Sequence, residues 1–346
     1  MELISLEDLN PEKKKKLTLR RCIGRFFMCL SVLLLSVLIF IFGLVYLVNY
    51  GPSPAARDLL VMTVMETSSA NFLATWFFTT EQINKIITEN SPVTFNEEID
   101  ETIINVPIVD ENNEVSKPIE NIEIVDVKGP NYKGKMMIVH DPSKVFLATS
   151  KQFGSEEKGE KLIDLIEINN AVGGINAGGF RDEVGYRSGG EPLGIVISES
   201  VVLSGEANTP YNIIGLDINN KLILGTMTVE EAITKGIRDA VSWKPVLVLN
   251  GKGAKVTGTG GGLNPRTAIG QRADGAILLL VIDGRQINSL GASYQNLIDV
   301  MLDFDAINAA NLDGGSSSMM IYEKEIITIC ASLYGPRRLP TAFLAR

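Results

Sequence analysis

Three glycine-flanked polar stretches in the second half of the chain have the composition of an anion-binding site. They are Asn176–Phe180, Asn264–Arg285 and Ala309–Ser318. In each, an Asn, Asp or Arg stands near glycines, which let the backbone turn sharply and expose its N–H groups. Successive N–H groups can form a concave nest for an anion, and arginine can add paired hydrogen bonds to phosphate oxygens. A simple tight turn explains any one stretch better, so the prediction requires all three to lie together.

The chain lacks the residues of several common catalytic sites. It has one histidine, His140, and one cysteine, Cys330, beyond its apolar N-terminal segment, which disfavours a zinc site and a Ser-His-Asp triad. The run Gly258–Gly262 lacks the lysine and hydroxyl residue of a P-loop, and no GxGxxG leads from a strand into a helix. A serine nucleophile in Ser316–Ser318 is a weak alternative because no base is near it in sequence. ATP, NAD and zinc chemistry are therefore not expected.

An apolar segment near the N-terminus predicts a membrane-spanning helix. Phe26–Val48 contains no charged residue over 23 positions, which is roughly 34 Å of helix and enough to cross a bilayer. Seven basic residues precede it and none lies in Asn49–Ala56, so the N-terminus is expected in the cytoplasm. A cleaved signal peptide is the alternative, but its apolar region is usually only about 7–15 residues long. We expect a single-pass protein of the cell membrane with its main domain outside.

The remaining composition is acidic and poor in cysteine. After Arg25 the chain has 25 Lys and Arg against 37 Asp and Glu. Such a balance favours solubility and argues against a nucleic-acid-binding surface. Cys22 and Cys29 lie in or beside the apolar segment, which leaves Cys330 without a partner for a disulfide in the outer domain.

The pattern of apolar residues and turns divides the chain into four parts. They are a basic tail (1–25), a transmembrane helix (26–48), a helical stalk and linker (49–118) and a main domain (119–346). In the main domain, helix-like stretches at 156–169, 228–240 and 295–304 alternate with strand-like stretches at 122–127, 136–139, 145–148, 194–197, 212–218, 246–249, 276–282 and 318–322. The mixed order predicts an α+β fold, with a mixed β-sheet flanked by helices.

The glycine-flanked stretches together resemble the phosphodiester glycosidase family, which includes uncovering-enzyme-like domains and bacterial exopolysaccharide-associated proteins. The matching segments are NAGGF at Asn176–Phe180, NPR-T-A-x-G at Asn264–Gly270, VIDGR at Val281–Arg285 and A-x-N-L-DGGSSS at Ala309–Ser318. Their order and spacing are those of the family. The resemblance covers Ile119 to Arg346, including the closing Arg337–Pro340, whereas residues 1–118 match nothing in the family's core.

The resemblance implies hydrolysis of a sugar C1–O bond whose leaving group is a phosphate monoester. It implies that Arg266, Arg285 and the amides of Gly314, Gly315 and Ser316 hold the phosphate, and that Asn176 orients the sugar. Gly179 and Thr267 complete the expected substrate-binding set. Asp283 and Asp313 are the candidate acid and base or nucleophile, with the assignment between them open. No cofactor is expected, and calcium on one of these aspartates is the single alternative.

A phosphorylated glycan or polysaccharide is the expected partner, in cell-envelope or exopolysaccharide metabolism. The alternative from another class is a non-catalytic envelope protein that binds such polymers or helps to assemble them. Both hypotheses use the same pocket, so the residues alone do not separate them.

Overall fold

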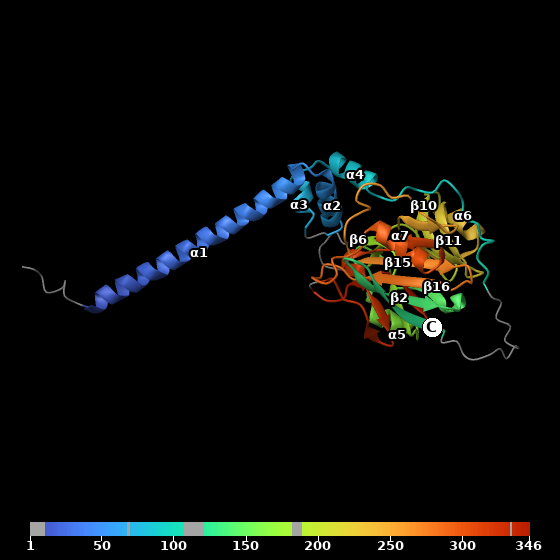
Figure 1. Cartoon of the computed structure of the whole chain (residues 1–346). Coiled ribbons are helices and arrows are strands. Elements are labelled where there is room, and N and C mark those ends of the chain that lie inside the picture. The colour runs from blue at the N-terminus through green and yellow to red at the C-terminus, as the bar shows by residue number, and fades with distance from the viewer. Residues whose placement is uncertain (1–10, 68–69, 107–120, 182–188, 333) are drawn as a thin grey trace, which may run out of the picture. The chain divides into compact units, whose positions relative to one another are not determined.

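The computed structural model describes residues 11–67, 70–106, 121–181, 189–332 and 334–346, and it divides the chain into two compact units, Met1–Arg57 and Asp58–Arg346. The first unit contains the long helix α1 (Pro11–Tyr50) (Figure 1). Its segment Arg21–Tyr50 has a mean hydropathy of 2.9 and is long and apolar enough to cross a membrane. A signal sequence would pass the same test of length and composition.

The second unit begins with a small helical region that has its own apolar core. It contains most of α2 (Pro54–Met65), α3 (Phe72–Thr75) and α4 (Thr80–Glu89). Thr79 caps α4 in a capping box with Gln82. The buried residues of this region are Val61, Met62, Val64, Ala74, Ile83 and Ile86. We call residues 58–99, as far as they are described, the cap.

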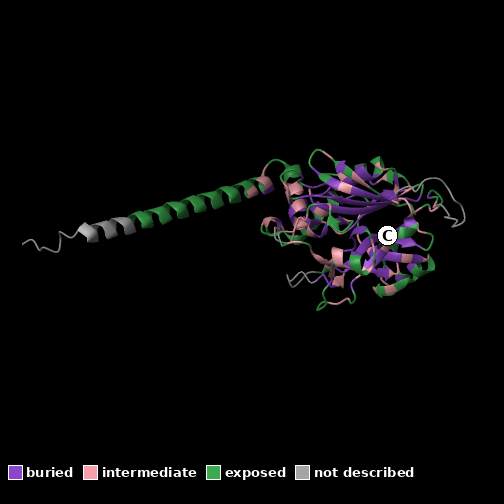
Figure 2. Ribbon diagram, turned by 90° about the horizontal axis from the view of Figure 1, so that it is seen from below, coloured by how far each residue is buried: buried purple, intermediate pink, exposed green. Residues whose placement is uncertain are grey.

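Three β-sheets share the main core of the second unit. The first has the order β1-β2-β16-β15-β17-β13-β14, the second β11-β10-β12-β8-β9 and the third β19-β18-β5-β21-β3. Met137 and Leu279 of the first sheet, Leu216 of the second, and Ile175 and Phe343 of the third lie in one buried cluster. Figure 2 accordingly shows the buried residues gathered in the sheets.

The strand bounds are as follows. The first sheet contains β1 (Ile122–Lys128), β2 (Lys133–Val139), β13 (Val246–Leu249), β14 (Lys252–Gly253), β15 (Arg266–Arg272), β16 (Ile277–Ile282) and β17 (Ala306–Asn311). The second contains β8 (Val196–Ser198), β9 (Val201–Ser204), β10 (Tyr211–Asp217), β11 (Leu222–Met227) and β12 (Ile237–Ser242). The third contains β3 (Val145–Thr149), β5 (Gly173–Asn176), β18 (Met320–Tyr322), β19 (Glu325–Ile326) and β21 (Thr341–Ala345), and the short ribbons are β4 (Glu160–Lys161) with β20 (Arg338–Leu339) and β6 (Phe180–Arg181) with β7 (Glu191–Pro192).

Strand β16 is central because both of its faces are apolar. Ile277, Leu279 and Val281 point into the core shared by the sheets, while Leu278, Leu280 and Ile282 belong to a second buried cluster. This alternation with period two is that of a strand buried on both sides. Helix α7 (Tyr294–Asp303) contributes Leu297, Ile298, Val300 and Met301 to the second cluster, so it covers the outer face of the sheet.

The strand order of the first sheet brings three chain segments to one edge. β15 pairs antiparallel with both β16 and β17, which therefore run in the same direction on either side of it. The start of β15 at Arg266 consequently lies at the same edge as the ends of β16 and β17. The Asp283–Arg285 turn follows β16 directly, and the Asp313–Ser316 turn follows β17 after Leu312.

The α+β fold agrees with the prediction, and two of the predicted helices are shorter than expected. In the stretch 156–169 only α5 (Leu162–Ile168) is helical, because residues 160–161 form β4. In 228–240 helix α6 (Val229–Thr234) ends before Gly236, whose φ of +71° breaks the helix, and Ile237 onward is strand β12. The predicted boundary at 118/119 lies outside the described residues.

Candidate active site

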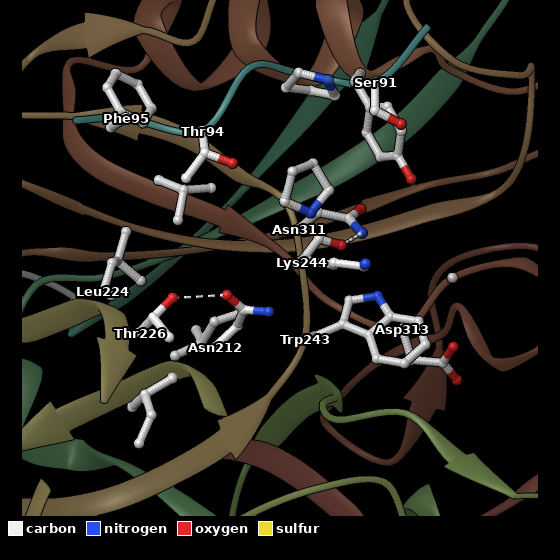
Figure 3. A pocket seen from close by; sticks show the side chains of 18 of the residues that line it. Ser91, Thr94, Phe95, Asn212, Leu224, Thr226, Trp243, Lys244, Asn311 and Asp313 are labelled. Carbon is white, nitrogen blue, oxygen red and sulfur yellow. Dashed lines mark hydrogen bonds between the residues drawn. The ribbon is translucent and has the colours of Figure 1, made fainter. Parts of the chain in front are cut away.

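A cavity of about 1350 Å³ opens where the ends of β15 and β17 meet the cap. Its polar lining includes Arg266, Asp313 and the Gly314–Ser317 turn, and residues 91–99 of the cap line another part of it. Figure 3 shows Asp313 and Trp243 at one end of the view and Asn212, Leu224 and Thr226 at the other. The cavity is therefore larger than the region around the charged residues.

Arg266 is a buried cation whose guanidinium is held on all sides. Its side chain is 2% exposed, its Nε donates to Ala292 O at 3.1 Å and its Nη2 donates to Gly262 O at 2.9 Å. Its Nη1 forms an ion pair with Glu66 Oε2 at 2.7 Å. Its guanidinium also lies 4.2 Å from the ring centroid of Tyr294. These contacts fix its position before any ligand arrives.

Arg285 brings a second positive charge to the same place from the end of β16. Its Nη2 donates to Thr67 Oγ1 at 2.8 Å and to Glu66 O at 3.2 Å. A Cβ added at Gly315 would lie 3.3 Å from this nitrogen, a tight contact that shows how closely the guanidinium approaches the turn. Partial burial lowers the pKa of Arg285, and the positive charge of Arg266 acts in the same direction.

Asp313 is the aspartate that lines the cavity, and its pKa is raised. Exclusion of water raises the pKa of Asp313 to about 6, although a hydrogen bond from Ser317, the charge of Arg337 and the Gly314 amide all act to lower it. The negative charge of Glu66 raises it further. Arg337 is itself positioned by a hydrogen bond to Ser316 Oγ at 3.1 Å and lies 4.8 Å from the ring centroid of Phe180. A carboxyl group with this pKa exchanges a proton near neutral pH.

Asn176 holds the backbone of Asp313 in place by a hydrogen bond, and Thr267 in turn positions Asn176. Asn176 Nδ2 donates to Asp313 O at 2.6 Å, and its Oδ1 accepts from Thr267 Oγ1 at 2.8 Å and from Met319 N at 3.2 Å. Both side chains are buried, at 1% and 0% exposure. Neither lines the cavity, so the structure places Asn176 where it positions Asp313. The predicted contact of Asn176 with the sugar stays a prediction.

Gly179 gives Trp243 its place at the cavity wall. A Cβ on Gly179 would lie 1.9 Å from the indole ring, so any larger residue would displace it. Trp243 lines the cavity together with Phe180. Gly179 thus shapes the site through Trp243.

The predicted nest of three amides is only partly available to a ligand. Gly315 N donates to Pro265 O at 2.9 Å, and the Gly314 amide bonds the carboxylate of Asp313. Within the described part of the chain, Ser316 has the one amide of the three for which no hydrogen bond is recorded. Gly315 has a φ of +62°, which suits glycine and turns the chain beneath Arg285.

The comparisons with known proteins agree with this arrangement. The family model described as phosphodiester glycosidase matches residues 169–346, just over half of the chain. The chain belongs to the phosphodiester glycosidase family. The matched range includes Asn176, Arg266, Arg285, Asp313 and Arg337, whereas the cap lies outside it.

Two proteins that this family member resembles bear on the argument. The SPbeta prophage-derived uncharacterized protein YomE of Bacillus subtilis is 31% identical over 199 residues, which are 54% of this chain and 30% of YomE. The chain thus spans under a third of that relative. The zebrafish N-acetylglucosamine-1-phosphodiester alpha-N-acetylglucosaminidase catalytic domain, auto-inhibited by its pro-peptide, matches with a TM-score of 0.54 and 20% identity over 65% of this chain and 82% of that one. At that identity the likeness concerns the fold alone.

Half of the predicted site residues lie outside the cavity lining: Asn176, Gly179, Thr267, Asp283 and Arg285. Asp283 is the one whose carboxylate is used to hold a neighbouring loop. Its Oδ1 accepts from Ile329 N at 2.7 Å, and its backbone oxygen accepts from Ser289 Oγ at 2.7 Å. Burial raises its pKa, with the Ile329 amide and Lys135 acting in the opposite direction. Its catalytic role stays a prediction, as does calcium binding by either aspartate. Among the described residues no group of three or more His, Cys, Asp and Glu is placed to hold a metal ion.

Glu66, Tyr294, Trp243 and Arg337 were not predicted as members of the site. Arg337 stands in the closing arginine stretch of the resemblance, which was a usable signal. Tyr294 and Trp243 carry no local pattern that separates them from core aromatics. Glu66 follows α2, more than 100 residues before the first motif, so no spacing connects it to the site.

Proposed function

We propose that the chain is a membrane-anchored hydrolase, acting outside the cytoplasm, that cleaves the glycosidic bond of a sugar-1-phosphodiester. The observation that carries the proposal is that Arg266 and Asp313 line one cavity, with Arg285 next to the Gly315 turn and the pKa of Asp313 raised to about 6. Two guanidinium groups match the oxygens of a phosphate. A carboxyl group that titrates near neutral pH suits proton transfer or attack at the sugar carbon.

In this reaction the arginines do most of the stabilisation of the transition state. A phosphate monoester is a good leaving group that departs without being protonated, and positive charges fixed in advance stabilise the negative charge that develops on it. Asp313 then acts in its ionised form, either as the base that activates water or as the nucleophile at C1. On this mechanism kcat/KM increases as pH rises through about 6, because the carboxylate form becomes populated.

The rest of the cavity supports a glycan as substrate. Its volume of about 1350 Å³ exceeds the roughly 300–1,000 Å³ of typical small-molecule pockets. Trp243 and Phe180 offer apolar ring faces near Asp313, and Asn311 lines the cavity with an Oδ1 that has no hydrogen-bond partner in the described residues. We propose the cell envelope or exopolysaccharide metabolism as the setting, since α1 would keep the enzyme at the membrane with its N-terminus inside.

The test is to identify the bond that breaks. The full chain in detergent micelles is incubated in ¹⁸O-labelled water with a glycosyl-1-phosphodiester and, separately, with the neutral glycoside of the same sugar and alcohol. We expect hydrolysis of the phosphodiester only, with the label on C1 of the released sugar and none on the phosphate monoester. Label on phosphate would instead indicate a phosphodiesterase, and tight binding without turnover would favour the non-catalytic polysaccharide-binding alternative.

A further inference from the structure

The position beside Arg266 that a phosphate would take is occupied by a side chain of the protein itself. Glu66 Oε2 lies 2.7 Å from Arg266 Nη1, and Tyr294 Oη donates to Glu66 Oε1 at 3.4 Å. The backbone oxygen of Glu66, just past the end of α2, accepts from Arg285 Nη2 at 3.2 Å. Carbonyls at a helix C-terminus carry partial negative charge, so both parts of Glu66 act as an anion toward the arginines.

Glu66 neutralises the two arginines only in part. Its carboxylate contacts Arg266, whereas Arg285 is bonded by the backbone oxygen, which carries only a partial negative charge. Burial lowers the pKa of Arg285; the charge of Glu66 opposes this and that of Arg266 adds to it. Two arginines and one carboxylate still leave the cluster with one unbalanced positive charge. A phosphate has enough oxygens to bond both guanidinium groups at once, which one carboxylate held on a helix end does not do. The Glu66 side chain is 28% exposed against 2% for Arg266, so it is the member of the pair that can leave.

The helical part of the cap contacts the domain along the glycine run 258–262. A Cβ on Gly262 would lie 2.5 Å from Thr63 N, so glycine is needed where α2 packs backbone to backbone. Thr63 Oγ1 accepts from Leu263 N at 3.2 Å. Asn90 Oδ1 accepts from Thr259 N at 2.7 Å and from Thr259 Oγ1 at 2.9 Å. The helical part of the cap has its own apolar core, whereas Phe95 and Ile99 pack against the main core, so the helical part is what can shift when these bonds loosen.

The location of Glu66 in the chain separates two roles for it. The family model covers residues 169–346, and the cap lies before this range. The chemistry common to the family should come from residues within the matched range, which already contains Arg266, Arg285 and Asp313. Glu66 is therefore better explained as an occupant of the phosphate position than as a catalytic carboxylate.

We propose that Glu66 is a built-in competitor for the phosphate group of the substrate, so that the site admits only ligands anionic enough to displace its carboxylate from Arg266. This inference rests on the proposed function in one respect, that the arginines bind phosphate. On this proposal Glu66 determines which ligands the site accepts, and the cap holds Glu66 in position.

The test measures equilibrium binding of inorganic phosphate to the full chain in detergent micelles, by calorimetry at pH 7.5 and low salt. Glu66→Gln keeps the shape and one acceptor for Arg266 but removes the competing charge, so we expect phosphate to bind at least about tenfold more tightly. Glu81→Gln removes an exposed carboxylate of the same cap, at the first turn of α4, and should leave the affinity unchanged. Asn90→Ala loosens the cap without touching the arginines and should tighten binding by a smaller factor.

Unchanged or weaker phosphate binding by a folded Glu66→Gln protein would overturn the proposal. If that variant fails to fold, unchanged affinity in Asn90→Ala overturns it instead. An equal gain in Glu81→Gln would also overturn it, because the effect would then come from net charge alone. Phosphate binding requires no turnover, so an absence of hydrolysis in the labelling assay would refute the proposed function and leave this result standing.

Discussion

The turns after β16 and β17 have similar sequences and different surroundings. Each places an Asp-Gly pair after a buried strand, on either side of β15. Asp313 faces the cavity and has a pKa of about 6, with Arg337 as a neighbouring charge. Asp283 is fixed at 2.7 Å by the Ile329 amide and does not line the cavity. The comparison teaches that the same short motif serves chemistry at one strand end and loop anchoring at the next.

The arginines at this edge differ in a parallel way. Arg266 starts β15 and is buried with hydrogen bonds or ion pairs from each of its guanidinium nitrogens. Arg285 follows Asp283 and is more open to solvent, with its bonds directed to Glu66, Thr67 and Asn264. Arg266 is therefore part of the fold as well as of the site, whereas Arg285 belongs mainly to the site.

Replacing the two aspartates separately should give the largest contrast. We expect Asp313→Asn to lower kcat on a glycosyl-1-phosphodiester by about a thousandfold, within the range for loss of a general base. Asp283→Asn keeps an oxygen for the Ile329 amide, so its kcat should remain within about tenfold of the original value. Steady-state assays of both proteins beside the unchanged chain provide the measurement. Equal losses in the two variants would mean that Asp283 also acts in the chemistry.

The fold was predictable where apolar residues dominate and less so where small residues form strands. The run of Ile, Leu and Val in β16 predicts a buried strand, and Val246–Leu249 is found as β13 with the expected bounds. β17 has the sequence AINAAN and was not predicted, because alanine and asparagine have low β-propensity. Its alanines are small enough to pack beneath α7, a tertiary requirement that no local pattern reveals.

For the site, sequence motifs located the polar residues but not what surrounds them. Arg266, Arg285 and Asp313 stand in glycine-flanked motifs and lie at one edge because of the strand order. Asn176 is predicted to contact the sugar, yet its side-chain amide bonds residues more than 90 positions away in the sequence. Sequence spacing does not predict contacts of this kind. Glu66 reaches the arginines from the cap across 200 residues of sequence, and only tertiary structure connects them.

Replacing the two arginines with alanine should separate their structural roles. Arg266→Ala leaves Glu66, Gly262 O and Ala292 O without their buried donor, and should lower the free energy of unfolding by about 3 kcal/mol. Arg285→Ala removes a more exposed cation and should cost less than about 1 kcal/mol. Thermal unfolding of the full chain in detergent, with circular dichroism as readout, compares them. A similar destabilisation by both would show that Arg285 is equally part of the packing.

The smallest predicted effect concerns pH and again contrasts the two aspartates. The pKa of Asp313 in the folded protein is about 6, above the value of about 3.9 for an unfolded chain. Between these values the folded state binds the additional proton, so the free energy of unfolding falls as pH rises from about 4 to about 6 and then levels off. An asparagine at position 313 does not ionise, so the free energy of unfolding of that variant does not fall in this way.

Asp313→Asn should therefore gain stability relative to the unchanged chain between pH 4 and pH 7. We expect a gain of about 1–2 kcal/mol, less than two full pKa units would give, because the side chain is partly open to the cavity. Unfolding of both proteins across this range measures the difference. Asp283→Asn provides the comparison: burial raises the pKa of Asp283 as well, but the hydrogen bond from the Ile329 amide opposes this, so its pH-dependent gain should be smaller. A stability difference that does not vary with pH would mean that water reaches Asp313 freely, and its special role at the end of β17 would then lose its physical basis.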